Sequence, residues 1–328
     1  MTSLSDLVDA QEGDFFALMT CKEELRTRDG RPYFKVGFRD AGREVTFPVW
    51  AESAFANECR DVWMPGEFYK LRATYRETNF GPQLDIRKIR PVVDEDAAEG
   101  FDPNMLLPAS RYDREGMFDD LLALAQERIA DEALRKLVVD LLVQNQPALL
   151  VLPAATRFHH AFLGGWLEHV RSVARNAVFL ADKYAEHYAD LQPPLDKDLV
   201  VAGAILHDIG KVREIEQRNE GAEYTPAGAL IGHILQGRDM VREAAAASGL
   251  DPEKLLRLEH LIVAHQRLPE WGSPIPPMTP EALLVHFADD VDAKFQIMYE
   301  VLRDDTSPGA LTGRKNVLGQ RVYRGGES

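Results

Sequence analysis

The sequence predicts a protein of two domains, a small all-β barrel followed by an all-α domain. Between residues 12 and 93, short runs of alternating apolar and polar residues are separated by glycine-containing turns, which is typical of β-strands. Beyond this region the apolar residues recur with the three- and four-residue spacing of amphipathic helices. We therefore expect a β domain over residues 1–93, a linker over 94–110, a helical domain over 111–311 and a basic C-terminal tail over 312–328.

Four stretches of the N-terminal region have the alternation expected of strands. They cover residues 33–38, 45–50, 68–75 and 83–89, and a helix-like run over 51–59 lies among them. Short strands around one small helix suit a small barrel of the oligonucleotide-binding kind. In this respect the region resembles an OB-fold.

Aromatic and basic side chains of the same region suit a platform for single-stranded nucleic acid, on which bases stack on rings and cations follow the phosphates. The alternative is that most of the rings form the barrel core, because alternation alone does not tell which face points outward. The candidates are Phe34, Phe38, Trp50, Tyr69, Tyr75, Arg39, Arg43, Lys70 and Arg72.

The charge of the chain is strongly negative and unevenly distributed. The formal net charge is −15, which argues against non-specific binding of nucleic acid over the whole surface. Residues 1–90 contain 14 Lys and Arg against 15 Asp and Glu, so nearly all of the negative charge lies after them. Cys21 and Cys59 have no metal-binding spacing, and we find neither a signal peptide nor a membrane-spanning run. We expect a soluble, cytoplasmic protein with free thiols.

The second part of the chain is expected to be helical throughout. Helical periodicity covers residues 118–125, 134–142, 165–189, 197–208, 229–248, 252–265 and 280–304, with a break at Gln146 and Pro147 and a proline-rich loop at 272–277. This many apolar helices is compatible with a homo-oligomer.

The most informative stretch is AILHDIGK, over residues 204–211. An apolar helical run ends there in His207 and Asp208, whose imidazole and carboxylate can both bind a divalent cation. Lys211 lies four residues after His207, so on a continuing helix it would project from about the same face. The alternative role for this lysine is to complement the negative end of a helix.

Further candidate ligands lie before and after this stretch. His169, His233, His265 and Asp289 are each on or beside an apolar helical run, where an unpaired ionisable group is costly to bury. One such histidine is more often a hydrogen-bonded core residue, but several on different helices are typical of a metal site between facing helices. This mixed donor set suits Mn, Fe, Co, Ni or Zn better than an all-oxygen Mg site. We expect one or two divalent ions, Mn²⁺ first, with Mg²⁺ as an alternative.

The ordered set H…HD…H…H…D resembles the HD-domain superfamily of metal-dependent phosphohydrolases over residues 150–300. The resemblance is carried by HHAFLGGWLEH at 159–169, LHDIGK at 206–211 and DDVDAK at 289–294. With an OB-like N-terminal domain, the chain is similar to the YhaM-type 3′→5′ exoribonucleases. This implies an OB module that holds single-stranded RNA and an HD module that removes nucleotides from its 3′ end.

The resemblance also implies roles for individual residues. The four core metal ligands correspond to His169, His207, Asp208 and Asp289, the additional ligands of two-metal members to His233 and His265, and the lysine at the scissile phosphate to Lys211. Asp208 would bridge the two metals. His286, three residues before Asp289, is expected to be structural or to lie behind the ligands.

Other histidines leave alternatives open. The superfamily usually has a second histidine at the position of Gln266. His260 lies five residues before His265, about 500° around a helix, so the two cannot share one face, and His260 is an alternative ligand or a supporting residue. His159 and His160 match a motif before the first ligand and either contact the substrate or pack at the start of the helix.

The leading hypothesis is a metal-dependent 3′→5′ exonuclease that acts on single-stranded RNA, with single-stranded DNA as an alternative substrate. A second hypothesis is a phosphohydrolase of small nucleotides or cyclic dinucleotides with a regulatory β domain, and a third is a nucleic-acid-binding protein with a structural metal. In the C-terminal tail, Arg314 and Lys315 either steer RNA toward the site or are solvated.

Overall fold

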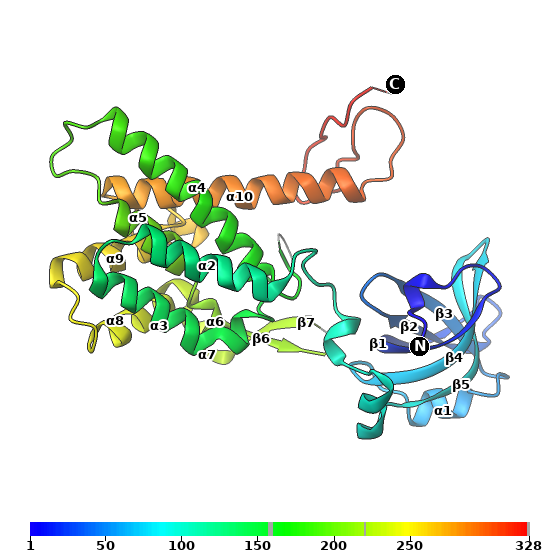
Figure 1. Ribbon diagram of the computed structural model, residues 1–328. Coiled ribbons are helices and arrows are strands. Elements are labelled where there is room, and N and C mark those ends of the chain that lie inside the picture. Colours follow the sequence, from blue (N-terminus) through cyan, green and yellow to red (C-terminus); the bar gives the residue numbers. More distant parts are fainter. Residues whose placement is uncertain (157–159, 220, 327–328) are drawn as a thin grey trace. The chain divides into compact units, whose positions relative to one another are not determined.

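The computed structural model describes residues 1–156, 160–219 and 221–326 (Figure 1). The chain divides into two compact units. The first unit consists of Met1–Ala109 with Arg218–Gly221, and the second consists of Ser110–Gln217 with Ala222–Ser328.

The first unit is an antiparallel five-stranded sheet with the strand order β3-β2-β1-β4-β5. The strands are β1 (Glu12–Arg26), β2 (Pro32–Arg39), β3 (Glu44–Trp50), β4 (Phe68–Thr78) and β5 (Gly81–Pro91), with helix α1 (Ala56–Asp61) between β3 and β4. Strands β3 and β5, at the two ends of this order, contact each other, so the sheet curls toward a barrel. This is the topology of an OB-fold, which confirms the expected fold class.

The long strand β1 is absent from the strand predictions, and its burial explains why. Residues Phe15 to Met19 are all buried, so the strand lacks the alternation that marks a half-exposed strand. Phe15, Ala17 and Met19 belong to the main core of the unit, whereas Phe16 and Leu18 pack on the other side against Phe68 and Leu106. Helix α1 also begins later than expected, because residues 51–55 form turns.

The segment expected to be a linker is ordered in two short 3₁₀ helices, Asp94–Glu99 and Pro103–Leu106. Asp96 is buried and accepts two hydrogen bonds from the guanidinium of Arg90, at 2.6 and 2.7 Å. The pairing places this acidic segment against the end of β5.

The second unit is helical, as the sequence predicts. Its helices are α2 (Arg114–Arg128), α3 (Glu132–Leu149), α4 (Gly165–His187), α5 (Lys197–Leu206), α6 (Lys211–Glu214), α7 (Pro226–Ile231), α8 (His233–Ala245), α9 (Pro252–Ala264) and α10 (Pro280–Asp304). Helix α5 is buried from Leu199 to Leu206 and contacts α2, α3, α4, α9 and α10. A helix that is apolar on all sides belongs in the centre of a bundle, and this one delivers the His-Asp pair there.

Three details of this unit differ from the sequence-based expectations. Helix α3 continues through Pro147 to Leu149, because the proline lies in its last turn. The single helix expected over 229–248 is divided into α7 and α8 at Gly232, whose φ of +79° a helix cannot accommodate. The sequence also did not predict β6 (Ile215–Arg218) and β7 (Gly221–Tyr224), which pair in a two-stranded sheet and are too short to show a period.

None of the helices in the described parts of the chain combines the length and the apolar character that crossing a membrane would require.

Candidate metal centre

Six predicted ligands converge in the second unit from five separate places in the chain. His169 lies in the second turn of α4, His207 and Asp208 follow α5, His233 begins α8, His265 follows α9, and Asp289 lies on α10. His169 and His207 are buried, with their Nε2 atoms 3.3 Å apart. Asp289 Oδ1 lies 3.2 Å from Nε2 of His169 and 3.8 Å from Nε2 of His207. Atoms that share one ion at about 2.0–2.2 Å lie about 3–4 Å apart, so this spacing suits one cation.

Asp208 directs its two carboxylate oxygens to different sets of histidines. Its Oδ2 lies 3.6 Å from Nε2 of His169 and 3.5 Å from Nε2 of His207. Its Oδ1 lies 3.3 Å from Nε2 of His233 and 3.7 Å from Nε2 of His265. The carboxylate is therefore positioned between two groups of nitrogen donors.

All four histidines turn the same nitrogen, Nε2, toward this centre, because a partner occupies the other nitrogen. Nδ1 of His207 is 2.8 Å from the carbonyl oxygen of Ala204, and Nδ1 of His265 is 2.7 Å from that of Ile262. A carbonyl can only accept, so these two Nδ1 atoms donate and leave Nε2 with a free lone pair. This tautomer is the one that a metal-binding Nε2 requires.

The remaining two histidines are oriented by carboxylates that the sequence analysis did not single out. Nδ1 of His169 lies 2.7 Å from Oδ2 of Asp292, and Nδ1 of His233 lies 3.0 Å from Oε1 of Glu214. Asp292 is three residues after Asp289 and so shares its face of α10. That spacing is the one signal that could have identified it; Glu214 has no comparable signal.

One buried atom supports the presence of a cation. Oδ1 of Asp208 has no hydrogen-bond partner among the described residues, although Asp208 is almost fully buried. Burial alone would raise the pKa of Asp208, but Lys211 and His207 hold this pKa well below its usual range, so the carboxylate is ionised. A buried anionic oxygen without a partner, facing imidazole lone pairs, is what a bound cation would satisfy.

The helix on which Lys211 was expected to share a face with His207 is interrupted. Helix α5 ends at Leu206 and α6 begins at Lys211, so no continuous helix joins His207 to the lysine. The buried Nζ instead donates to Oδ2 of Asp208 at 2.6 Å, across the intervening turn.

The tight turn after Asp208 also fixes the position of His233. A Cβ atom at Gly210 would lie 2.0 Å from the carbonyl oxygen of His233 and 2.4 Å from the nitrogen of Gly237. Only glycine allows this approach between the turn and α8. The close packing brings the first residue of α8 within reach of Asp208.

Comparison with known proteins identifies the family. A family model described as HD domain matches residues 166–294. The chain is 30% identical over 314 residues to the 3′-5′ exoribonuclease YhaM of Bacillus subtilis (strain 168), which covers 95% of this chain and 94% of that protein. It is 31% identical over 318 residues to the YhaM protein of Bacillus pumilus (strain SAFR-032), with the same two coverages. The chain belongs to the YhaM family of 3′-5′ exoribonucleases.

This assignment confirms the resemblance inferred from the sequence, and the HD domain of the YhaM family implies a divalent metal ion. Among solved structures, the chain is also similar to the second OB-fold domain of replication protein A from Methanococcus maripaludis. The identity is 14% and the TM-score 0.22, over 28% of this chain and 93% of that one.

Two other candidate histidines of this YhaM-family chain, His260 and His286, lie outside the cluster. His265 lies in the cluster, whereas Nε2 of His260 accepts a hydrogen bond from the backbone nitrogen of Met278 at 2.9 Å, outside it. Nδ1 of His286 lies 2.7 Å from the carbonyl oxygen of His265, which places His286 behind the cluster. The amide of Gln266 lies beside His233, with 3.4 Å between the two Nε2 atoms.

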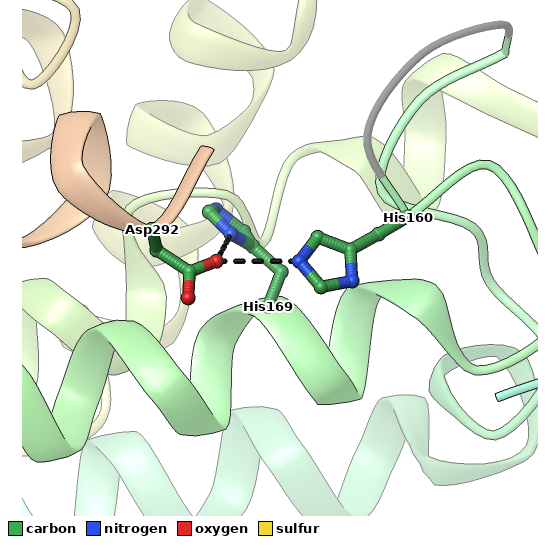
Figure 2. Close-up of side chains that lie close together, drawn as sticks. All are labelled: His160, His169 and Asp292. Atoms are coloured by element: carbon green, nitrogen blue, oxygen red, sulfur yellow. Dashed lines mark hydrogen bonds and ion pairs between the residues drawn. The ribbon is translucent and has the colours of Figure 1, made fainter. Parts of the chain in front are cut away.

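The two histidines of the motif before α4 have different outcomes. His160 is buried, and its Nε2 lies 3.3 Å from the same oxygen of Asp292 that contacts His169 (Figure 2). His160 therefore adjoins the cluster without facing its centre. His159 lies outside the described residues.

Most of the aromatic residues considered for a nucleic-acid platform form the barrel core. Phe38, Tyr69 and Tyr75 are buried in it. Trp50 is exposed and lies beside Tyr33, with 5.2 Å between the ring centroids and 42° between the ring planes.

The basic candidates of the first unit are largely engaged with neighbouring groups. Arg72 pairs with Asp14 and Lys70 with Glu99, while Arg43 donates to the carbonyl oxygens of Leu4 and Leu7. Among the aromatic residues expected to form the platform, Trp50 is therefore the one exposed ring in the described chain, and Tyr33, which was not predicted, lies beside it.

The C-terminal tail folds back on itself. The backbone nitrogen of Thr312 donates to the carbonyl oxygen of Val322 at 2.9 Å, and Arg324 pairs with Asp305 at the end of α10. Arg314 and Lys315 lie in the loop between these contacts and are exposed.

Proposed function

We propose that this protein hydrolyses single-stranded RNA from its 3′ end with the help of divalent metal ions. The observation that carries the proposal is the position of Asp208, whose two oxygens lie between two sets of imidazole Nε2 atoms. The curated relatives of similar length are named 3′-5′ exoribonucleases, which supports the same activity here.

The arrangement of the donor atoms favours two metal ions per chain. One ion would be held by His169, His207, Asp208 and Asp289, and a second by His233, His265 and the other oxygen of Asp208. When bound, the ions would supply an activated water and neutralise charge on the phosphate. Four imidazole nitrogens with two carboxylates favour Mn²⁺, Fe, Co, Ni or Zn over Mg²⁺, and we propose Mn²⁺.

The chain itself contributes positioning and charge. The two carbonyls and two carboxylates behind the histidines hold each ring in one tautomer and one orientation. Lys211, kept in place by Asp208, provides a fixed ammonium group at the edge of the centre, where it would stabilise the negative charge that develops on a phosphate. The buried surroundings strengthen this interaction, because they exclude the water that would screen it.

The barrel over residues 1–93 is proposed to hold the single strand while residues 111–311 hydrolyse it. A hollow of about 480 Å³ on the barrel is lined by residues that include Trp50, Phe55, Arg76 and Gln83. The exposed ring of Trp50, beside the half-buried Phe55, a guanidinium and an amide, suits unpaired bases and their phosphates.

A ladder assay tests the proposal. A 5′-labelled RNA of about 20 nucleotides, incubated with the full-length protein and Mn²⁺, is expected to shorten one nucleotide at a time from the 3′ end. His207→Ala should abolish shortening but keep the fold. A matched DNA strand tests the preference for RNA. Turnover of mononucleotides or cyclic dinucleotides without shortening of the RNA would contradict the proposal.

A further inference from the structure

A second polar pocket lies beside the metal centre, between α4 and α10. Its volume is about 360 Å³, within the range of small-molecule sites. Glu168, Arg171 and Arg175 line it from α4, and Asp292 and Phe295 from α10. Since α4 and α10 contact each other along the bundle, the pocket follows the same two helices that carry His169 and Asp289.

The pocket and the metal centre share two residues. Asp292 lines the pocket and holds Nδ1 of His169 at 2.7 Å, and His160 lines it and contacts Asp292 at 3.3 Å (Figure 2). A group bound in this pocket would therefore be one side chain away from the proposed scissile phosphate.

The rim of the pocket carries three arginines, although the protein as a whole is acidic. The guanidinium of Arg171 is held by Asp120 through bonds of 2.6 Å. Arg175 is more available, since 61% of its side chain is exposed and its Nη2 lies 3.6 Å from Asp120. A guanidinium beside a site for phosphodiesters suits a phosphate group.

Exposed aromatic rings lie beside these cations. Phe295 is 73% exposed and Tyr112 is 44% exposed, and both line the pocket. The guanidinium of Arg111 lies over the rings of Tyr112 and Tyr299, at 4.9 and 5.3 Å from their centroids. Flat rings and guanidinium planes are the surfaces on which unpaired bases stack.

The floor of the pocket holds an unsatisfied polar atom. His160 is 3% exposed, and within the described chain its Nδ1 has no hydrogen-bond partner. This Nδ1 lies 4.0 Å from Oε1 of Glu168, which is too long for a direct hydrogen bond. A ligand hydroxyl between the two groups would bond to both. His160 also has a φ of +57°, a backbone conformation that non-glycine residues seldom adopt and that often marks a functional site.

We propose that this pocket binds one nucleotide of the RNA next to the scissile bond, with Phe295 stacking on its base and Arg175 contacting its phosphate. The proposal rests on the function proposed above and names where the strand is held within the helical unit. The hydroxyl groups of the sugar would face His160 and Glu168.

Two variants with matched controls test the pocket by direct binding. Adenosine 5′-monophosphate is titrated calorimetrically into the full-length protein with its bound metal. Phe295→Ala is expected to weaken binding about tenfold, because stacking of one base on a ring contributes about 1–3 kcal/mol. Its control is Phe179→Ala, a similarly exposed phenylalanine (67%) of α4 that does not line the pocket.

Arg175→Gln is expected to weaken binding of the monophosphate about tenfold as well, because a charged hydrogen bond is lost. Its control is Lys183→Gln, which removes the same charge about 12 Å further along α4.

Both substituted side chains are well exposed, so the melting temperature of each variant should stay close to that of the unaltered protein. Equal affinities in Phe295→Ala and Phe179→Ala, or no binding by the unaltered protein, would overturn the proposal.

The kinetics of RNA shortening distinguish a failure of the proposed pocket from a failure of the proposed function. On an RNA of about five nucleotides, Phe295→Ala and Arg175→Gln should raise KM about tenfold and leave kcat within about twofold, whereas both controls keep the unaltered KM. Unchanged KM values in an enzyme that shortens RNA would refute the pocket alone. Failure of the unaltered protein to shorten RNA would refute the function, while the binding of the monophosphate would still decide whether the pocket holds a nucleotide.

Discussion

Oδ2 of Asp292 lies 2.7 Å from Nδ1 of His169, so the aspartate one turn beyond Asp289 holds the first histidine of the cluster. The same oxygen also contacts His160. One carboxylate thus connects the metal centre to the adjoining pocket. Its replacement should therefore alter both the binding of the metal and the binding of a ligand in the pocket.

Replacement of this carboxylate should weaken metal binding without removing a ligand. Asp292→Asn is expected to lower the affinity for Mn²⁺ about 10- to 100-fold, because His169 loses the negative charge of the carboxylate that orients its ring and makes its nitrogen more basic. Calorimetric titration of the metal-free protein measures the affinity. Asp290→Asn, whose carboxylate pairs with Lys294, is the control and should bind the metal normally. Equal affinities in both variants would contradict the role of Asp292.

Lys211 should act on the rate and not on the metal content. Lys211→Gln is expected to reduce kcat about 100-fold, the range found when one donor to a developing negative charge is removed. Elemental analysis should still find the metal, since the ligands remain. Lys211→Arg keeps the charge and should recover part of the rate. Loss of the metal with an unchanged kcat per bound ion would show that the lysine only supports Asp208.

Metal binding should release a proton from His169. Burial alone would lower the pKa of His169, but Asp289 and Asp292 raise it to about 10 in the metal-free protein. A raised pKa favours the folded metal-free protein below the ordinary value near 6.5, and this contribution disappears as the pH rises through 10. At pH 7.5 the ring must therefore lose its proton to bind a cation, so the affinity for the metal should increase with pH.

Calorimetry in buffers of different ionisation enthalpy counts the released protons. About one proton per protein is expected from His169, whereas His265 should contribute none. Burial and the neighbouring His207 lower the pKa of His265 to about 3, so this ring is already neutral. An affinity that does not change between pH 6 and 9 would contradict this coupling.

The basic loop of the tail is best tested by point substitutions. Deletion of residues 312–328 would also remove Thr312 and Val322, whose backbone bond closes the loop. In Arg314→Gln with Lys315→Gln, the slope of log affinity for RNA against log salt should become shallower by up to about 1.4, or about 0.7 per lost phosphate contact on a single strand. An unchanged slope, measured by fluorescence anisotropy, would exclude the loop from RNA binding.

Much of the proposed ligand set could be predicted because each residue stands at a helix or its end. His207 and Asp208 directly follow a helix that is buried from Leu199 to Leu206, and a polar pair at the end of such a helix indicates a functional or hydrogen-bonding role. The spacing around a helix also separated His265 from His260, although it could not choose between them. That choice depends on which face of α9 meets α5, and hence on tertiary packing.

Other features could not be predicted from the sequence, because they depend on contacts between distant segments of the chain. Asp292 meets His169 across 123 positions, and the sequence offers only its place one turn after Asp289 to distinguish it from the other acidic residues. Strand β1 carries no period because both of its faces are covered. The contact of Lys211 with Asp208 was not expected, because the helix that would carry Lys211 onto the face of His207 is interrupted by a turn.

The close approach at Gly210 has a mechanical consequence. Gly210, two residues after Asp208, lies directly against the start of α8. A displacement of that helix would therefore move the carboxylate of Asp208, and a displacement of the carboxylate would move the helix. The two halves of the centre would then tighten or loosen together. A ligand or a substitution that displaces α8 would therefore change the geometry in which the cluster binds a metal ion.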